Sequence, residues 1–179
     1  MKQSLSNIAE TACAEHKAQQ RPGEFTVALE LVASFNPKII LEIGCADGGT
    51  LFAWTKICPE VYGITLPGYE VNDHGADVIV ATSHSEETVS RIEDKLNARE
   101  LDMLFIDGDH SYDGVKADWE MYSPLVRKGG LVLFHDVANW RNEPEVVWFW
   151  KDLNRGYMVC DALESVLSVG FGIVEMGIE

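Results

Sequence analysis

The chain has 179 residues, of which 46% are hydrophobic and 24% are charged, a composition typical of one folded domain. Fourteen Lys and Arg residues against 29 Asp and Glu residues leave a formal net charge of −15. Nucleic acids and anionic membranes are bound largely through Lys and Arg contacts to phosphates, so this charge argues against both classes of partner. It favours a small molecule, a divalent cation or a cationic ligand.

Hydropathy and cysteine spacing indicate the cellular compartment of the protein. No apolar stretch approaches the roughly 20 residues that span a bilayer. Residues 1–20 have no apolar core followed by a small-residue cleavage site. The four cysteines form no CxxC pair; they are Cys13, Cys45, Cys58 and Cys160. We therefore expect a cytoplasmic protein with reduced thiols.

The N-terminal residues predict a helical arm. Helical spacing of apolar residues indicates one helix over 5–19 and a second over 24–35, with a break at Arg21-Pro22-Gly23. We divide the chain into an arm, 1–22, and a domain, 23–179. Apolar residues on the arm offer a surface for a second copy, which leaves a homo-oligomer open; they are Leu5, Ile8 and Ala12.

From residue 38 onward, short apolar runs alternate with helical patterns. Strands are predicted over 38–43, 61–64, 77–81, 101–106, 130–135, 157–162 and 172–176. Helices are predicted over 51–57, 85–98, 112–125 and 145–153. This order predicts an α/β fold with a doubly wound, seven-stranded, mostly parallel sheet, helices on both faces and a C-terminal antiparallel hairpin. Ligands of such folds bind at the carboxyl ends of the strands.

A glycine-rich turn, EIGCADGGT from Glu42, follows the first predicted strand and opens a helix. Gly44 permits a sharp turn, and Gly48 or Gly49 lets a ligand approach the backbone. Glu42 can accept hydrogen bonds from an amine or from ribose hydroxyls. A plain strand-to-helix turn would also use glycine. A dinucleotide-binding fingerprint would require glycine where this chain has Ala46.

Acidic and histidine side chains follow two later strands. Asp107 comes directly after the strand at 101–106, and His135-Asp136 ends the strand at 130–135. Crowded carboxylates repel each other unless a cation or protons relieve them, and oxygen ligands with one imidazole suit Mg²⁺ or Mn²⁺. These three residues are therefore a candidate metal site. Alternatively, Asp107 caps the next helix and His135 pairs with Asp136.

The turn pattern E-x-G-x-x-x-G-x-T and the block FIDGDHSYDGVKADWEMYSPLVRKGGLVLFHDV, residues 105–137, carry a resemblance to a known family. They resemble the class I S-adenosylmethionine-dependent methyltransferases, in the metal-dependent O-methyltransferase branch grouped with macrocin O-methyltransferase and the cephalosporin-hydroxylase-like proteins. The resemblance implies a Rossmann-like fold that binds S-adenosylmethionine and a divalent metal, with Mg²⁺ expected.

Carried over position by position, the resemblance assigns roles to residues of this chain. The implied metal ligands are Asp107, His135 and Asp136. His110 matches the position of the general base. The implied cofactor-binding residues are Glu42, Gly44, Ala46, Gly48, Thr50, Thr65, Ser83 and Asp107.

This assignment is chemically consistent with methyl transfer to an oxygen atom. The acceptor hydroxyl must lose its proton, a bound divalent ion lowers the pKa of that hydroxyl, and an imidazole can accept the proton. The expected function is therefore metal-assisted O-methyl transfer from S-adenosylmethionine to a small hydroxylated molecule.

Two departures from the family pattern favour a competing hypothesis. Thr65 and Thr82 stand where relatives carry acids that contact the ribose and lie near the adenine, and a neutral hydroxyl binds more weakly than a carboxylate. Glu70 or Asp73 could take the ribose instead. The alternative is a non-catalytic methyltransferase-like ligand-binding domain with a degenerate cofactor site. A nicotinamide-linked oxidoreductase would also require an acid at position 65.

The remaining aromatic and histidine residues give secondary expectations. Tyr69 and Trp140-Arg141 lie in loops suited to contacting an acceptor molecule. We expect Trp148 and Trp150 to be core. His74 and His84 are expected at the surface without a partner.

Overall fold

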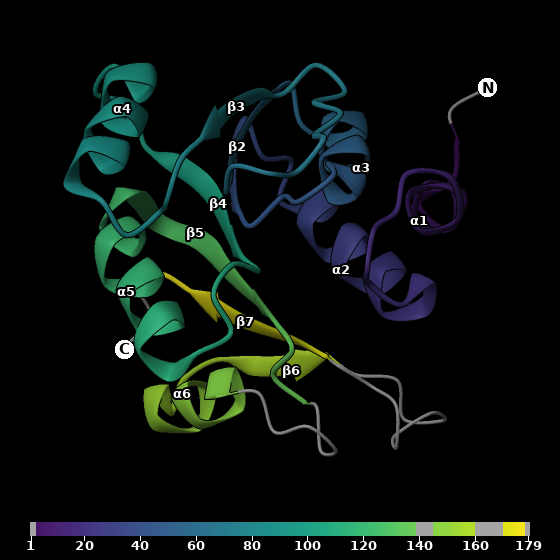
Figure 1. The fold of residues 1–179 in the computed structure, drawn as a ribbon. Coiled ribbons are helices and arrows are strands. Elements are labelled where there is room, and N and C mark those ends of the chain that lie inside the picture. The colour runs from purple at the N-terminus through teal and green to yellow at the C-terminus, as the bar shows by residue number, and fades with distance from the viewer. Residues whose placement is uncertain (1–2, 139–144, 160–169, 178–179) are drawn as a thin grey trace.

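The computed structural model describes residues 3–138, 145–159 and 170–177 (Figure 1). Its helices are α1 (Leu5–Glu15), α2 (Pro22–Ser34), α3 (Gly49–Ile57), α4 (Glu86–Leu96), α5 (Tyr112–Tyr122) and α6 (Glu145–Leu153), with a short 3₁₀ turn at Ser123–Leu125. Its strands are β1 (Ile39–Ile43), β2 (Glu60–Thr65), β3 (Asp77–Val80), β4 (Leu101–Ile106), β5 (Val126–His135), β6 (Tyr157–Val159) and β7 (Phe171–Glu175).

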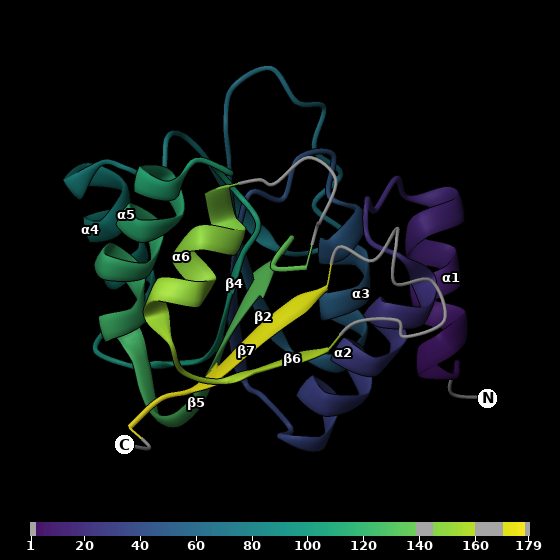
Figure 2. The same ribbon diagram turned by 90° about the horizontal axis from the view of Figure 1, so that it is seen from below.

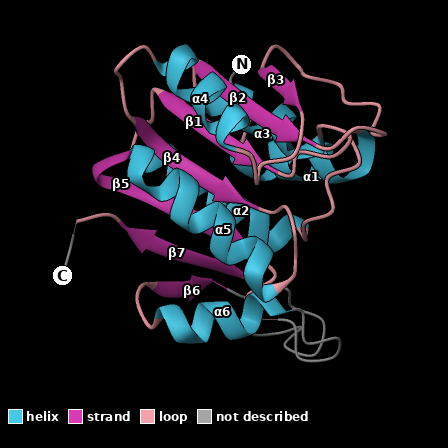
Figure 3. Cartoon of the chain, turned by 60° about the vertical axis from the view of Figure 1, so that its left-hand side comes forward, coloured by secondary structure: helices cyan, strands magenta, loops and turns pink. Residues whose placement is uncertain are grey.

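The strands form one sheet in the order β3-β2-β1-β4-β5-β7-β6. The first five in this order are parallel, whereas β7 is antiparallel to both β5 and β6 (Figure 3). The predicted doubly wound α/β fold with a C-terminal antiparallel pair is confirmed.

Helices cover both faces of the sheet, with α1, α2 and α3 on one side and α4, α5 and α6 on the other (Figures 1 and 2). Neighbouring residues of β1 pack into different layers: Ile40 joins the cluster containing Phe25 and Trp54, and Leu41 joins the cluster containing Ile92 and Phe134. The reason is that successive side chains of a strand point to opposite faces, so a strand covered on both sides must be apolar throughout.

The apolar side of helix α1 packs against α2 and α3. Ile8 and Ala12 are buried in the same cluster as Phe25 of α2 and Leu51 of α3. They are therefore unavailable to a second copy, contrary to the expectation for these two side chains. None of the described helices has both the length and the apolar character needed to cross a membrane.

Several predicted boundaries were wrong by a few residues. Helix α1 ends at Glu15 rather than 19, and Lys17 takes a left-handed φ of +63°, which no helix continues. The predicted break at 21–23 is also wrong, because Pro22 is the first residue of α2, where its missing N–H costs nothing. Strand β5 begins at Val126 rather than at the predicted residue 130.

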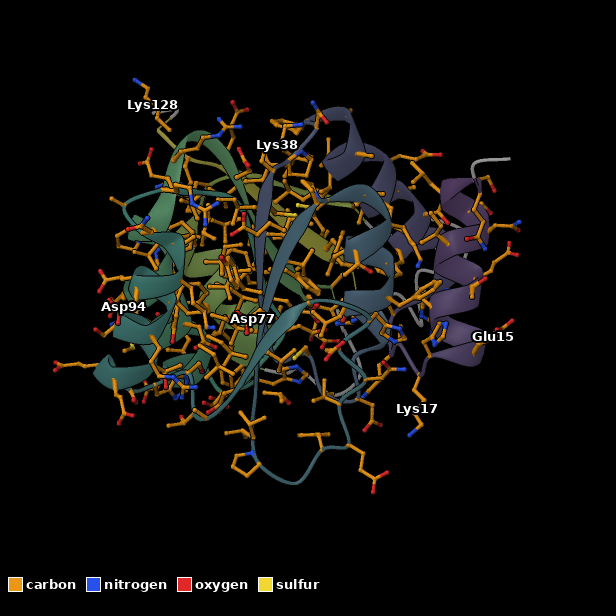
Figure 4. The ribbon with its side chains drawn as sticks, turned by 90° about the horizontal axis from the view of Figure 1, so that it is seen from above. Glu15, Lys17, Lys38, Asp77, Asp94 and Lys128 are labelled. Carbon is orange, nitrogen blue, oxygen red and sulfur yellow. The ribbon has the colours of Figure 1, made fainter. Side chains whose placement is uncertain are left out.

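Because β1 to β5 are parallel, the loops that follow them meet at one edge of the sheet, which we call the carboxyl edge. Figure 4 shows Lys38, directly before β1, and Lys128, in the first part of β5, at one end of the molecule. Lys17 lies at the opposite end (Figure 4). The segment between α1 and α2 thus lies at the carboxyl edge, beside the loops that follow the strands.

Candidate functional site

A cavity of about 810 Å³ lies at the carboxyl edge. Its walls come from the glycine turn after β1, the end of β2, the loop after β3, the loops after β4 and β5, and the segment 17–20. The structure brings most of the predicted site residues to this cavity: Gly44, Ala46, Thr50, Thr65, Ser83, Asp107, His110, His135 and Asp136. Glu42 and Gly48 do not line it.

The turn after β1 has a backbone that few residues can adopt. Gly44 has a φ of +92°, and a Cβ there would lie 2.0 Å from the carbonyl oxygen of Asp107. Ala46 takes a left-handed φ of +44°, an unusual conformation for alanine that stores strain at the cavity wall. Gly48 also has a φ of +92°, but a Cβ there would meet the backbone of Asn72. Gly48 therefore serves packing of the turn, not the close ligand approach predicted for it.

Glu42 lies beneath this turn and is fully buried, with 0% exposure. The Thr50 hydroxyl donates a hydrogen bond to its carboxyl group. Burial raises the pKa of Glu42 to about 8, so the group carries a proton at neutral pH. Contrary to the predicted direct contact with a ligand, the Glu42 side chain does not reach the cavity. It supports the turn from below through Thr50.

Two carboxylates and an imidazole converge at the ends of β4 and β5. The ligand atoms of Asp107, His110 and Asp136 all lie within 4.8 Å of one another. The His110 Nε2 atom lies 3.5 Å from Asp107 Oδ1 and 3.4 Å from Asp136 Oδ2. Asp107 is held by its backbone N–H, which donates to the carbonyl of Ile43 at 2.9 Å, and Asp136 takes a left-handed φ of +61°.

His135 lies against both carboxylates with which it was predicted to converge, and it is deeply buried. Its ring is only 5% exposed, and its Nδ1 lies 3.3 Å from Asp107 Oδ1 and 3.2 Å from Asp136 Oδ2. Burial lowers the pKa of His135, but the two carboxylates outweigh this and raise it to about 10. The group of ligand atoms within 4.8 Å of one another contains Asp107, His110 and Asp136, and the ligand role of His135 stays a prediction.

The same contacts shift the other two groups. Burial works to raise the pKa of the Asp107 carboxyl, but the charge and hydrogen bonds of His135 and His110 bring it below its ordinary value. The hydrogen bond to Asp107 raises the pKa of His110 above its ordinary value. The cluster thus holds two carboxylates against two imidazoles, and a divalent cation could also relieve the repulsion between the carboxylates.

The opposite end of the cavity, after β2 and β3, is polar but largely uncharged. Thr65 is 3% exposed, and its hydroxyl has no hydrogen-bond partner among the described residues. His84 lines the cavity with its Nε2 3.2 Å from Asp118 Oδ1, so the expectation that it lacks a partner is wrong. Tyr122 donates to the carbonyl of Ser83 at 2.7 Å. Asp118 and Tyr122 of α5 therefore position this loop.

Gln20 is a site residue that sequence reasoning missed. Its Nε2 donates to Asp107 Oδ2 at 2.7 Å, although the two residues are 87 positions apart. No local motif marks it, because it lies in the connection between two helices and meets Asp107 only in the folded chain. Lys17 of the same connection pairs with Asp47 of the glycine turn at 3.3 Å.

The secondary expectations had mixed outcomes. Tyr69 lines the cavity, and its contact with an acceptor molecule stays a prediction. His74 packs edge-to-face against His16, their ring centroids 4.6 Å apart, so it is not without a partner. Trp148 is 45% exposed rather than core, whereas Trp150 is partly buried against the core. Trp140-Arg141 lies outside the described residues.

Comparisons with known proteins agree with this geometry. The sequence profile of a family described as "Methyltransferase domain" matches residues 41–137, which include the glycine turn and the cluster at β4 and β5. An uncharacterized protein of Acanthamoeba polyphaga mimivirus is 34% identical over 122 residues, covering 60% of this chain and 55% of that protein. One of Sinorhizobium fredii is 27% identical over 158 residues, covering 77% and 17%. The chain thus spans about half the length of the first relative and about a sixth of the second.

Solved structures share the fold at low sequence identity. An O-methyltransferase from Bacillus cereus, in complex with SAH, is 18% identical with a TM-score of 0.65, covering 95% of this chain and 88% of that one. The methyltransferase MycE of the mycinamycin biosynthetic pathway, in complex with Mg and SAH, is 21% identical with a TM-score of 0.66, covering 86% and 45%.

The profile match spans more than half of the chain, and the strand order and the placement of the glycine turn agree with it. This chain belongs to the family of methyltransferase domains.

Proposed function

We propose that this domain transfers a methyl group from S-adenosylmethionine to a hydroxyl of a small molecule with the help of a divalent cation, Mg²⁺ being the expected one. The proposal is carried by one observation. A strained glycine turn and a cluster of two carboxylates and an imidazole line the same cavity. The SAH bound in the Bacillus cereus enzyme and the Mg and SAH bound in MycE support it by analogy.

The residues present fit a cation. Carboxylate oxygens and an imidazole nitrogen within 4.8 Å of one another are ligands that Mg²⁺ or Mn²⁺ accepts. The carboxylates of Asp107 and Asp136 would hold the ion, with the His110 imidazole beside it. When bound, it would lower the pKa of the acceptor hydroxyl and orient it.

The residues also fit a cationic, hydroxyl-bearing cofactor. Gly44 keeps the turn close to Asp107, and the buried Thr65 hydroxyl lacks a partner that a ribose hydroxyl would supply. The sulfonium group of S-adenosylmethionine would supply the methyl group for an in-line displacement by oxygen. The −15 net charge favours binding of such a cation.

The chain's own side chains would then divide the remaining tasks. His110 is half exposed to the cavity and is the candidate that accepts the acceptor's proton at Nε2. His135, buried against both carboxylates, fixes their orientation by donating Nδ1–H. Tyr69 reaches the cavity from the loop after β2 and would contact the acceptor molecule.

A specific observation favours a second candidate, a methyltransferase-like ligand-binding domain without transfer. At the end of β2 the cavity is lined by Thr65 and Leu66, and Glu70 and Asp73 of the following loop do not line it. The cofactor's ribose would therefore meet a hydroxyl instead of a carboxylate.

Methyl transfer assays separate the two. Radiolabelled S-adenosylmethionine is incubated with the protein and a panel of catechols, sugars and other small hydroxylated molecules, first with Mg²⁺ and then with EDTA. The enzyme proposal predicts labelled product that disappears with EDTA and returns with added Mg²⁺. SAH binding without transfer to any acceptor would favour the binding domain, and no SAH binding at millimolar concentration would contradict both.

A further inference from the structure

Gln20 links the segment between α1 and α2 to the charged cluster. Its Nε2 donates to Asp107 Oδ2 at 2.7 Å, while Asp107 Oδ1 faces His110 at 3.5 Å and His135 at 3.3 Å. Each oxygen of this carboxylate therefore has its own partners. The Gln20 hydrogen bond fixes the rotation of the carboxylate and directs Oδ1 toward the cluster.

The backbone of Gln20 is itself firmly placed. The Cys13 thiol donates to the Gln20 carbonyl at 3.2 Å, and the Ala18 N–H donates to the Ala12 carbonyl at 3.0 Å. The segment also presses on α3, because a Cβ at Gly49 would lie 2.2 Å from the Ala18 nitrogen. The amide group of Gln20 is thus held in position before any ligand arrives.

The other end of the same amide points to a ligand. Gln20 is only 6% exposed and lines the cavity, yet its buried Oε1 accepts no hydrogen bond from any described residue. An unpaired buried acceptor is costly, and a donor group in the cavity would remove that cost.

We propose that Gln20 is a positioning residue of this site. Its Nε2 orients Asp107 for cation binding, and its Oε1 accepts a hydrogen bond from a hydroxyl or ammonium group of the bound small molecule. The inference rests on the proposed function, since it assumes that a cation binds at Asp107. It also assigns the N-terminal segment a part in the site beyond packing.

The test is Mn²⁺ binding without substrate, followed by electron paramagnetic resonance. Gln20→Leu has a similar volume and removes both hydrogen-bonding ends. Loss of a partner that orients a metal ligand typically weakens metal affinity by about 10- to 100-fold, and we expect Gln20→Leu to fall in that range. Gln20→Asn keeps the amide but is one methylene shorter, so we expect a weakening too. Gln3→Leu, an exposed site, is the matched control and should bind like the unmodified protein.

Mn²⁺ affinity unchanged in folded Gln20→Leu and Gln20→Asn would overturn the proposal. Absence of Mn²⁺ binding in the unmodified protein would instead contradict the proposed function. In that case the Gln20–Asp107 hydrogen bond is tested by urea unfolding. Gln20→Leu should shift the unfolding midpoint of the unmodified protein but not that of a protein that already carries Asp107→Leu. Equal shifts in both backgrounds would overturn the role of Gln20 in orienting Asp107.

Discussion

The two ends of the cavity are built from different chemistry. After β4 and β5, Asp107, His110, His135 and Asp136 are interlocked by contacts of 3.2–3.5 Å. After β2 and β3, the cavity is lined mainly by hydroxyl groups and by His84, and the Thr65 hydroxyl has no partner among the described residues. The charged end is already organised, whereas part of the neutral end lacks the hydrogen bonds that a ligand would complete.

This difference has a functional consequence. A charged, organised cluster favours strong and specific binding of a cation, whereas single neutral hydroxyls contribute modestly to binding. We therefore expect substitutions at the charged end to have larger effects on ligand binding than substitutions at the neutral end.

The largest effect is expected at Asp107. Asp107→Asn removes one charge and one candidate ligand, and we expect Mn²⁺ affinity to fall by roughly 100-fold or more, since loss of an outer partner alone costs about 10- to 100-fold. Titration calorimetry or paramagnetic resonance measures the affinity. Asp94→Asn on the exposed face of α4 removes the same charge far from the cavity (Figure 4) and should leave it unchanged. Equal Mn²⁺ affinities in the two variants would contradict the claim that the charged end of the cavity binds the cation.

The next largest effect is expected on the free energy of unfolding. It comes from Glu42, which lies beneath the glycine turn that joins the two ends of the cavity. Its carboxyl pKa is raised from the ordinary 4.5 to about 8 by burial, so the folded protein keeps a proton that the unfolded chain releases. The stabilisation from this proton is full below pH 4.5 and is lost as pH rises to about 8. Glu42→Gln mimics the protonated group at every pH.

At pH 7, Glu42→Gln should raise the free energy of unfolding on the order of 3 kcal/mol, with less gain at pH 5. Urea unfolding at both pH values provides the measurement. A gain that does not depend on pH would contradict the account of Glu42 as a buried, protonated acid.

A smaller effect is expected at the neutral end. Thr65→Val keeps the shape but removes the unpartnered hydroxyl, and we expect SAH affinity to fall by about 2- to 10-fold, the value of one neutral hydrogen bond. Titration calorimetry with SAH gives the affinity, and Thr55→Val on α3 serves as control. A loss as large as that of Mn²⁺ affinity in Asp107→Asn would show that the two ends contribute alike.

The smallest effect is expected at the Lys17–Asp47 pair. Lys17 has a side chain that is 73% exposed, so water and salt screen its attraction to Asp47. Lys17→Met should change the free energy of unfolding by less than about 0.5 kcal/mol. Denaturant titration that gives a change above about 1 kcal/mol would mean that this exposed pair stabilises the glycine turn far more than such pairs usually do.

Part of the fold and of the candidate site could be predicted from the sequence. Strands such as 101–106 and the turn after β1 were predictable because apolar runs and glycines reflect local backbone requirements. Asp107 and Asp136 could be placed together because parallel strands end at one edge. The burial of His135 and the exposure of His110 could not be predicted, since they depend on tertiary packing. Gln20 and Asp118 were missed because they reach Asp107 and His84 only through tertiary packing.

The central claim is that one cavity holds a divalent cation at its charged end and S-adenosylmethionine along the glycine turn. A crystal structure of the protein grown with Mn²⁺ and SAH tests it most directly, because the anomalous signal of manganese locates the ion. The account predicts manganese beside Asp107, His110 and Asp136, with SAH against the turn at 44–50. Manganese elsewhere, or SAH outside this cavity, would contradict it.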